Sequence, residues 1–466
     1  MSTQLPSPFH VIVIGAGTGG LCLAHGLKRA GISVAIYERD RTRCDGLQGY
    51  RVGIDPDGSR ALHECLPPDL YDTFFATCAR TPRFSNNILT EQLSEVLSLE
   101  ERPNTDPVNS EKSVSRMTLT QVLLTGLEDV VHFDKTFTHC EQHPDGTVTA
   151  YFEDGTSATS DVLVAADGTN SRLRRQYLPH AKLEDSGLIG ITGKVPLTSE
   201  TKALLPPKVL EGVSMVFAPK GYSCILHVME FKWDSRGELK NGIGGNDAAL
   251  LSAWPGMLYD NTRDYIMWGF AASARRLPDD VLAMKGPDLH RLVVDMTTEW
   301  HPNLRQLFKL ADPSTCFPIN IRTSVPVEPW STTNVTLIGD AIHTMTPGRG
   351  VGANTALRDA ALLCRNLTAA RDGRMALMEA IHDYEAQMID YGFDAVLESR
   401  KQMDGDGLIH KPVVGRAVLA GMRTGMRIVN HLPPVKKRMA YAQQRYRGAD
   451  RPNPRIAAGQ RVPDPE

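Results

Sequence analysis

Apolar residues near the start of the chain follow first a strand pattern and then a helical one. Residues 9–14 (FHVIVI) are a short β-branched run that enters a glycine turn, which is typical of a buried parallel strand. Residues 21–31 (LCLAHGLKRAG) have helical spacing and end at a glycine suited to a helix C-terminus. Residues 33–40 (SVAIYERD) return to a strand pattern. The pattern predicts one complete βαβ unit.

The pattern changes between about 185 and 330. Strand-like runs at 213–217, 222–231 and 264–272 are separated by proline and glycine, which predicts a mixed sheet with a covering layer. Residues 334–341 (NVTLIGDA) then resume the buried-strand pattern of the first unit. The chain is therefore predicted to leave its first domain and to return to it.

Shorter elements fill the remaining stretches. The polar, proline-containing run 101–113 predicts a loop, and 115–127 predicts a helix. A hairpin is expected to turn at Asp154–Gly155 and to lead into a core strand. After residue 354 the pattern is mostly helical, with one apolar face marked by Leu377, Ile381, Tyr384 and Met388.

The stretch 411–447 is rich in Arg and Lys and predicts an amphipathic helix followed by a basic tail. Two interpretations remain open for it. The helix either packs on the domain as a solvated surface element or touches a membrane surface from one side.

Composition narrows the class of protein. The chain has 466 residues, 41% of them hydrophobic and 23% charged, which are ordinary values for a globular protein of two or three domains. A formal net charge of −3 provides no overall attraction to nucleic acid. No uninterrupted apolar run is long enough to span a membrane, and MSTQLPSPFH lacks the features of a secretory signal. A cytoplasmic protein is expected.

The cysteines indicate neither disulfides nor a metal site. Their spacing contains no CxxC pair and no zinc-like combination with histidine, so we expect reduced and mostly buried thiols. The eight are Cys22, Cys44, Cys65, Cys78, Cys140, Cys224, Cys316 and Cys364.

The stretch GAGTGG at 15–20 fits the dinucleotide fingerprint G-x-G-x-x-G, between a predicted strand and a predicted helix. Gly15 would make the tight turn, Gly17 would admit a pyrophosphate, and Gly20 would let the helix pack on the strand. The helix, beginning near Thr18, would direct its N–H groups at the phosphates. Glu38, at the end of the second strand, would accept hydrogen bonds from a ribose. The fingerprint alone leaves NAD and FAD open.

Two later motifs distinguish the cofactors. DVLVAADGTNSRLRR contains Asp167 and Gly168, and VTLIGDAIHTMTPGRGVGAN contains Gly339, Asp340, Pro347, Gly350, Gly352, Ala353 and Asn354. With these motifs in this order, the sequence resembles the single-component, class A FAD-dependent monooxygenases of the p-hydroxybenzoate hydroxylase type. The resemblance covers roughly 1–180 and 330–400.

The resemblance implies a role for each motif residue. Glu38 and Arg39 would bind the adenosine side of FAD, and Arg116 would contact its flavin side. Asp167 and Gly168 would shape the site for FAD and for incoming NAD(P)H. Asp340 would hydrogen-bond the ribityl chain, and the loop 347–354 would line the isoalloxazine ring. His343 would have a supporting role.

Two arginines have alternative interpretations. Arg51 lies in GYRVGIDPDGSRAL, where the family often has a related pattern, and either approaches the flavin or faces solvent. Arg349, inside the flavin loop, either meets a substrate or faces solvent.

The fold implied is α/β. It comprises a Rossmann-like FAD-binding domain of the GR2 type, with an inserted mixed-sheet substrate domain and a C-terminal helical segment. The predicted division is 1–184 and 331–400 for the FAD-binding domain, 185–330 for the substrate domain and 401–466 for the C-terminal segment.

The resemblance also implies a reaction. NAD(P)H would reduce FAD, and a flavin C4a-hydroperoxide formed with O2 would transfer one oxygen atom to an electron-rich substrate. Hydroxylation, epoxidation and Baeyer–Villiger insertion all remain open, as do NADH or NADPH and a monomer or a homodimer. No second dinucleotide fingerprint is present, which agrees with transient NAD(P)H binding.

Strand alternation suggests where a substrate would bind. It places Ile225, His227, Met229 and Phe231 on one face, either as a substrate wall or as core. His227 would be a ligand to a phenol. A hydrophobic, planar substrate such as an aromatic polyketide or alkaloid is expected. Further candidates, again either as wall or as core, are Met215, Phe217, Trp268 and Phe270.

Three other functions share related folds. A flavin-dependent halogenase typically carries W-x-W-x-I-P, and none of the five tryptophans stands in that motif. A prenyl-reductase-like saturating enzyme is the second alternative. A non-enzymatic carrier is the third, but a carrier has no need of the ribityl and isoalloxazine motifs.

Overall fold

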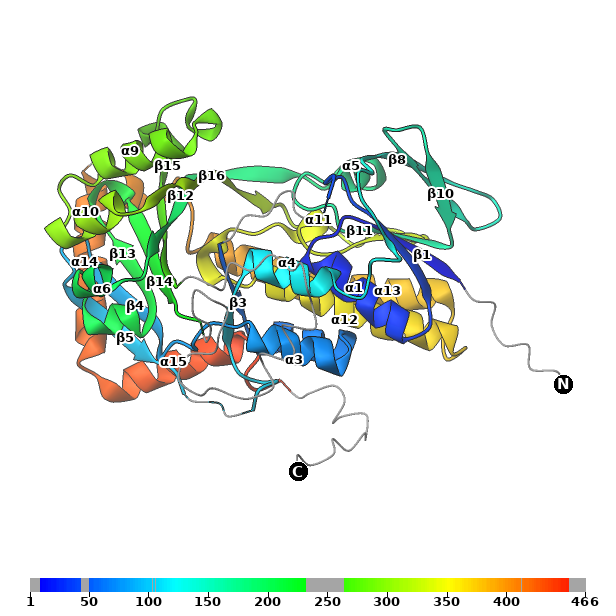
Figure 1. Ribbon diagram of the computed structural model, residues 1–466, viewed down its shortest axis with the longest axis horizontal. Coiled ribbons are helices and arrows are strands. Elements are labelled where there is room, and N and C mark those ends of the chain that lie inside the picture. The colour runs from blue at the N-terminus through cyan, green and yellow to red at the C-terminus, as the bar shows by residue number, and fades with distance from the viewer. Residues whose placement is uncertain are drawn as a thin grey trace.

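Two sheets organise the molecule (Figure 1). The computed structural model describes residues 9–42, 50–102, 104, 106–231, 264–411 and 413–451. The first sheet has five parallel strands in the order β17–β11–β1–β2–β7. These strands are β1 (His10–Ile14), β2 (Ser33–Tyr37), β7 (Val131–His132), β11 (Val162–Ala165) and β17 (Val335–Leu337).

The predicted βαβ unit and the return of the chain are confirmed. Helix α1 (Thr18–Arg29) joins β1 to β2, and β17 adds to the sheet beside β11. Buried β-branched and leucine side chains on both faces of these strands explain the pattern seen in the sequence. The chain leaves the sheet after β11 and returns to it about 170 residues later, so this domain is built from separated segments.

A helical layer covers the parallel sheet. Helix α1 packs against α2 (Pro56–Cys65) and α12 (Gly352–Arg371), and α12 packs against α13 (Leu377–Arg400). The predicted apolar face of α13 is confirmed, because Ile381, Tyr384 and Met388 are fully buried. The Tyr384 hydroxyl also donates to the carbonyl of Leu337 (2.8 Å), which ties α13 to β17. Further helices of this domain are α3 (Pro68–Ala76), α4 (Arg116–Leu124), α5 (Arg172–Tyr177) and α11 (Asp340–His343).

The second sheet is mixed and seven-stranded, in the order β16–β12–β15–β14–β13–β4–β5. Helices α9 (Gly286–Met296) and α10 (Pro302–Lys309) cover one of its faces. Its last two strands come from 84–100, inside the stretch that the sequence assigned to the first domain. The strands are β4 (Phe84–Thr90), β5 (Glu95–Glu100), β12 (Leu183–Pro196), β13 (Gly212–Phe217), β14 (Ser223–Met229), β15 (Tyr265–Ser273) and β16 (Asp312–Ser324). The division at 184, 330 and 400 stays a prediction.

Two small sheets complete the fold. The predicted hairpin is confirmed as β9 (Val148–Phe152) and β10 (Ser157–Ser160), and Gly155 supplies the positive φ of 82° at its turn. Strand β8 (Phe137–Gln142) pairs with β9. Strands β3 (Arg51–Ile54) and β6 (Lys112–Ser115) form a two-stranded ladder.

The C-terminal segment differs from the prediction. Helix α14 (Val414–Asn430) is the expected amphipathic helix, but a second helix, α15 (Pro433–Tyr446), replaces the expected basic tail. Two prolines at its first turn fit helix initiation, because they need no amide hydrogen there. Both helices pack on β5. Among the described residues, no helix combines the length and apolarity needed to cross a membrane.

Candidate functional site

The glycine loop between β1 and α1 has the geometry that its sequence predicts. Gly15 adopts φ +106°, and a Cβ there would lie 2.5 Å from the carbonyl oxygen of Ala166. A Cβ on Gly20 would overlap the carbonyl oxygen of Gly15. A Cβ on Gly17, in contrast, would have only an ordinary contact with Ala166 O at 3.8 Å. Gly15 and Gly20 are therefore required by the protein itself, whereas Gly17 leaves open space beside the loop.

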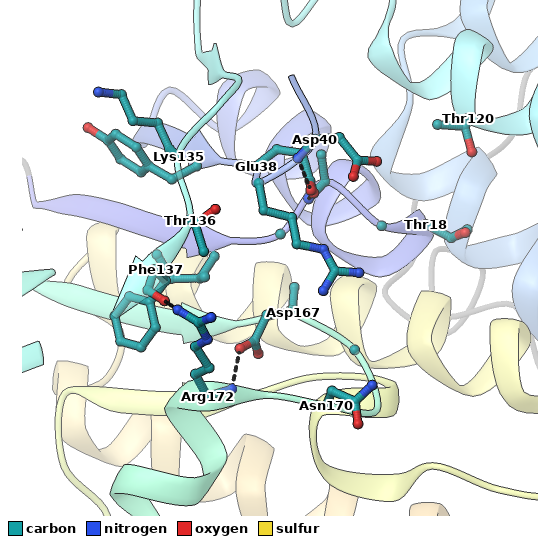
Figure 2. A pocket seen from close by; sticks show the side chains of 18 of the residues that line it. Thr18, Glu38, Asp40, Thr120, Lys135, Thr136, Phe137, Asp167, Asn170 and Arg172 are labelled. Carbon is teal, nitrogen blue, oxygen red and sulfur yellow. Dashed lines mark hydrogen bonds between the residues drawn. The ribbon is translucent and has the colours of Figure 1, made fainter. Parts of the chain in front are cut away.

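Glu38 lies at the end of β2 and folds toward this loop (Figure 2). Its carboxylate accepts from the backbone N–H of Ala16 (2.5 Å) and of Asp40 (2.9 Å). The carboxylate is only partly buried and lines the adjoining cavity. It is placed to accept hydrogen bonds from a hydroxylated ligand beside the glycine loop.

A cavity of about 530 Å³ adjoins the loop (Figure 2). Of the predicted cofactor residues, it is lined by Gly15, Gly17, Thr18, Glu38, Arg39, Arg116, Asp167 and Gly168. Polar side chains that the sequence analysis did not single out also line its wall. These include Lys135, Asn170, Arg172 and Arg175. Five basic and three acidic side chains line the cavity. Lys135 and Arg172 pair with Asp154 and Glu153, so Arg39, Arg116 and Arg175 are the basic groups placed to meet an anionic group such as a pyrophosphate.

The turn after β11 is held by its own side chains. Asp167 accepts from the backbone N–H of Arg172 (2.8 Å), and its Oδ1 is buried with no partner among the described residues. Burial raises the pKa of this carboxyl. Arg174 donates to the carbonyls of Thr169 (3.0 Å) and Ala341 (2.9 Å). Arg174 therefore joins the Asp167–Gly168 turn to the Gly339–Asp340 turn, two motifs far apart in sequence.

Gly339 and Asp340 are positioned from behind by Asp359 of α12. Asp359 is fully buried, and its Oδ2 accepts from Gly339 N–H (2.7 Å) and lies 2.7 Å from His343 Nε2. Its Oδ1 accepts from the hydroxyl of Tyr391 (2.6 Å). The Asp340 side chain is exposed and free to meet a ligand, although the surrounding protein raises its pKa by desolvation. His343 has no exposed surface, and its supporting role stays a prediction.

The flavin-loop motif is braced by neighbouring elements. Asn354, in the first turn of α12, accepts from Asp55 N–H (3.0 Å) and donates to the carbonyl of Gly53 (2.8 Å). Its side chain thus binds to β3 and to the residue that follows this strand. Gly350 adopts φ +65°, and no atom lies within 4 Å of the Cβ it would carry. Pro347, Gly350, Gly352 and Ala353 do not line the cavity of Figure 2, so their contact with a flavin stays a prediction.

Arg51 and Arg349, for which the sequence left two interpretations each, have different environments. Arg349 pairs with Glu398 (3.0 Å), and its guanidinium carbon lies 4.3 Å from the ring centre of Tyr446 in α15. Arg51 is half-buried rather than solvent-facing. Its Nε donates to the hydroxyl of Ser113 (3.1 Å), and its backbone N–H lies 3.3 Å from Sδ of Met267. Burial lowers the pKa of Arg51 to about 10, which leaves it charged at neutral pH.

The second sheet presents the predicted face of β14 toward Arg51. His227 pairs in register with Met267, and Met229 pairs with Tyr265. Side chains of these strands and of neighbouring segments form an apolar cluster composed of Ala76, Ala79, Met229, Phe231, Tyr265 and Met267, with Tyr50 and Ile225 packed against it. His227 is buried, and neither ring nitrogen has a partner in the described parts of the chain. Burial lowers its pKa well below the ordinary value, so the imidazole is neutral.

The prediction that Trp268 and Phe270 add to this wall is wrong. Trp268 pairs with Leu226, so it points to the opposite face of the sheet. There Trp268 packs on Phe308 and Phe270 packs on Trp300, under α9 and α10. The register places Met267 and Tyr265 on the His227 face instead. Neighbouring residues of a strand point to opposite faces, so a shift of one residue exchanges the two sets.

Helix α15 adds charge to the same region, which the sequence did not predict. Arg447, at its end, pairs with Glu111 (2.7 Å). Burial, and to a smaller extent the charge of Glu111, raises the pKa of nearby Glu101 to about 8. Burial likewise raises the pKa of Asp55, the N-cap of α2, to about 8. The charges of Glu111 and Glu101 act on Arg51 and oppose the effect of burial on its pKa.

Comparison with known proteins identifies the family. A family model described as "FAD binding domain" matches residues 9–240 and 297–394. The chain belongs to this family. The family resemblance and the fold class that the three sequence motifs implied are confirmed.

Proteins of similar sequence include FAD-dependent monooxygenases. The chain is 32% identical over 407 residues to the dual O-methyltransferase/FAD-dependent monooxygenase CTB3 of Cercospora beticola, covering 81% of this chain and 44% of that protein. The chain therefore spans less than half the length of this relative. It is 29% identical over 399 residues to the FAD-dependent urate hydroxylase of Klebsiella pneumoniae, covering 84% of this chain and 89% of that protein.

Solved structures agree with this family. A proposed FAD-containing monooxygenase from Photorhabdus luminescens matches with TM-score 0.72 and 32% identity over 85% of this chain and 98% of the other. A variant of Klebsiella pneumoniae HpxO complexed with FAD matches with TM-score 0.68 and 25% identity, over 92% and 98% of the two chains.

The residues present fit FAD. The open side of Gly17 and the basic cavity wall suit a pyrophosphate, and Glu38 suits a ribose. Asp167 Oδ1 has no partner among the described residues, and the Asp340 carboxylate is exposed, so both could accept hydrogen bonds from the cofactor. Gly15 and Gly20 close the turn between β1 and α1, and Gly17 leaves the space beside this turn open to a cofactor.

Proposed function

We propose that the protein is an FAD-dependent monooxygenase that uses NAD(P)H and O2 to insert one oxygen atom into a hydrophobic, aromatic or polyketide-like small molecule. The observation that carries the proposal is the cavity at the glycine loop, together with an exposed Asp340 that follows Gly339, whose backbone N–H is held by Asp359. The urate hydroxylase and CTB3 names of the relatives support the reaction class. A location in the cytoplasm belongs to the same proposal.

The chain's own residues would bind and orient the cofactor. Gly17 and the N-terminus of α1 would hold the pyrophosphate, Glu38 the ribose, and Asp340 the ribityl hydroxyls. Arg116, which lines the cavity and also lowers the pKa of Asp340 by its charge, would lie between the phosphates and the flavin. When bound, FAD would accept a hydride from NAD(P)H and activate O2.

The substrate would lie against the His227 face of the second sheet. Apolar side chains there exclude water, which protects a reactive oxygen species from side reactions. The neutral imidazole of His227 can accept a hydrogen bond from a phenol, and the charged Arg51 lies close enough to influence its pKa. A flat, oxygenated aromatic molecule satisfies both the apolar wall and these two polar groups.

The first experiment measures bound flavin and oxygen use. The purified protein is expected to show flavin absorbance and to oxidise NADPH or NADH slowly in air. A planar phenolic substrate should accelerate both NAD(P)H oxidation and O2 uptake, with one oxygen atom found in the product by mass spectrometry from ¹⁸O2. A protein that remains colourless after incubation with FAD would favour a carrier instead.

Replacing His227 tests the substrate face. His227→Phe is expected to raise KM for a phenolic substrate roughly 2- to 12-fold, the value of one lost neutral hydrogen bond, with a smaller change in kcat. His227→Gln, which keeps an acceptor, should restore part of the affinity. A matched change on the opposite face, Trp268→Phe, should leave KM unaltered. Equal KM values for His227→Phe and the unmodified protein would remove His227 from the site.

A further inference from the structure

The junction of α14 and α15 exposes apolar side chains that the fold does not use. We name residues 427–439 the α14–α15 corner; in Figure 1 it lies where the two C-terminal helices meet, at the lower left. Ile428 is 58% exposed, Leu432 45%, Met439 40% and Val435 39%. Four large apolar side chains within twelve residues are more than scattered surface positions, and such clusters usually mark an interaction site.

Packing of the two helices is complete without these residues. The inner side of α14 and α15 contributes Met426, Val429 and Ala440 to a small core with Leu97 and Leu99 of β5. Asn430 also donates to Glu95 Oε1 (2.9 Å), which ties the end of α14 to the sheet. The corner is therefore held by its inner side, and its outer apolar side chains are available to a partner.

The charges of the corner all have one sign. Arg427, Lys437 and Arg438 are exposed and Lys436 is half-buried, and none of the four forms an ion pair with another described residue. The sequence from 407 to 449 contains no Asp or Glu. Basic groups therefore surround the four apolar side chains.

Acidic groups from neighbouring elements do not neutralise the corner. Glu91, before β5, is held by Arg423 of α14. Glu95 of β5 pairs with Lys208 (2.7 Å) in addition to Asn430. The carboxylates packed beside these helices are thus already paired, and the basic groups of the corner remain available.

We propose that the α14–α15 corner docks the protein on an anionic lipid surface. Ile428, Leu432, Val435 and Met439 would enter the interfacial region, while the basic side chains would contact lipid phosphates. The acid-free basic sequence is the observation that favours an anionic membrane over a second copy of this chain, because two such corners would repel each other. This proposal is independent of the monooxygenase reaction.

Vesicle binding tests the proposal directly. The full chain is expected to co-sediment with phosphatidylglycerol/phosphatidylcholine vesicles and much less with pure phosphatidylcholine, and 0.5 M NaCl should weaken the binding. Lys436→Gln/Lys437→Gln/Arg438→Gln should lower the partition coefficient on the order of 100-fold, about fivefold for each charge removed near the surface. Ile428→Ser/Leu432→Ser should lower it at least several-fold without a change in charge.

A matched control removes the same charge elsewhere. Lys285→Gln/Arg291→Gln/Lys309→Gln alters exposed basic residues at the helices α9 and α10, away from the corner. This control should bind vesicles as the unmodified protein does. Equal losses in both triple variants, or no preference for anionic vesicles, would overturn the proposal.

Light scattering separates membrane docking from self-association. A dimer that Ile428→Ser/Leu432→Ser converts to a monomer would show that a second copy covers the corner, and would also overturn the proposal. Circular dichroism of each variant establishes that the helices remain folded, so that lost binding reports on the surface. Flavin content is measured in the same samples, and its absence would contradict the proposed function while leaving the vesicle result unaffected.

Discussion

Gly17→Val is expected to weaken FAD binding strongly in a protein that remains folded. Gly17 has φ −74°, which any residue can adopt, and its Cβ would lie 3.8 Å from the closest atom, the carbonyl oxygen of Ala166. A valine there costs the apoprotein little. It would, however, fill the space through which a pyrophosphate must approach the backbone. Loss of two hydrogen bonds to a charged phosphate corresponds to roughly 100-fold weaker FAD binding or more.

The measurement pairs flavin affinity with stability. FAD titration followed by fluorescence gives the affinity, and thermal unfolding of the apoprotein gives the stability. Gly17→Val should change the first and spare the second. Gly20→Val is the contrasting variant, because its Cβ would overlap the Gly15 carbonyl and should reduce stability. Unchanged FAD affinity in Gly17→Val would remove the loop 15–20 from the cofactor site.

Local patterns predicted the elements that carry the cofactor motifs. The β1–α1–β2 unit, the hairpin at Gly155 and the buried face of α13 each follow from spacing within about 30 residues. The glycine motif was also predictable, because positive φ and close packing at Gly15 admit few other residues. These features depend on the backbone and on near neighbours, which a single sequence describes.

Long-range pairing was not predictable in the same way. Strands β4 and β5 join the second sheet through β13, whose sequence lies more than 100 residues later. The interpretation of Trp268 as a wall residue was wrong, because the side of the sheet on which it lies depends on the register with β14. Arg174 links two motifs through the carbonyls of Thr169 and Ala341, a contact that no spacing indicates. Sequence thus located the cofactor motifs, and tertiary structure determined which side chains support them.

Asp359 illustrates such a supporting residue, and its removal should strongly destabilise the protein. In Asp359→Ala, the buried Gly339 N–H and His343 Nε2 and the partly buried Tyr391 hydroxyl all lose their acceptor. We expect the free energy of unfolding to fall by about 3–5 kcal/mol, the usual cost of breaking a buried pair. Tyr391→Phe, which removes only one of the three donors, should cost about 1 kcal/mol.

The effect of Asp359→Ala should depend on pH. Burial alone would lower the pKa of His343, but the charge and hydrogen bond of Asp359 outweigh it, so the pKa is raised above the unfolded value near 6.5. A raised pKa stabilises the folded protein fully below about pH 6.5, and this stabilisation is lost as pH rises through the folded pKa. The difference between the unmodified protein and Asp359→Ala should therefore be largest at pH 5.5 and smaller at pH 8.5.

Urea unfolding between pH 5.5 and 8.5 measures this difference. Asp359→Asn is the graded control, because it keeps an acceptor oxygen but removes the charge that raises the pKa of His343. It should lose most of the pH dependence while retaining part of the stability. A difference between Asp359→Ala and the unmodified protein that is constant with pH would show that His343 is neutral throughout.

Asp359 also holds the amide of Gly339, so both variants should bind FAD more weakly than the unmodified protein. The loss of affinity should be smaller in Asp359→Asn than in Asp359→Ala. Cofactor binding would then depend on a carboxylate that is too deeply buried to touch the cofactor itself.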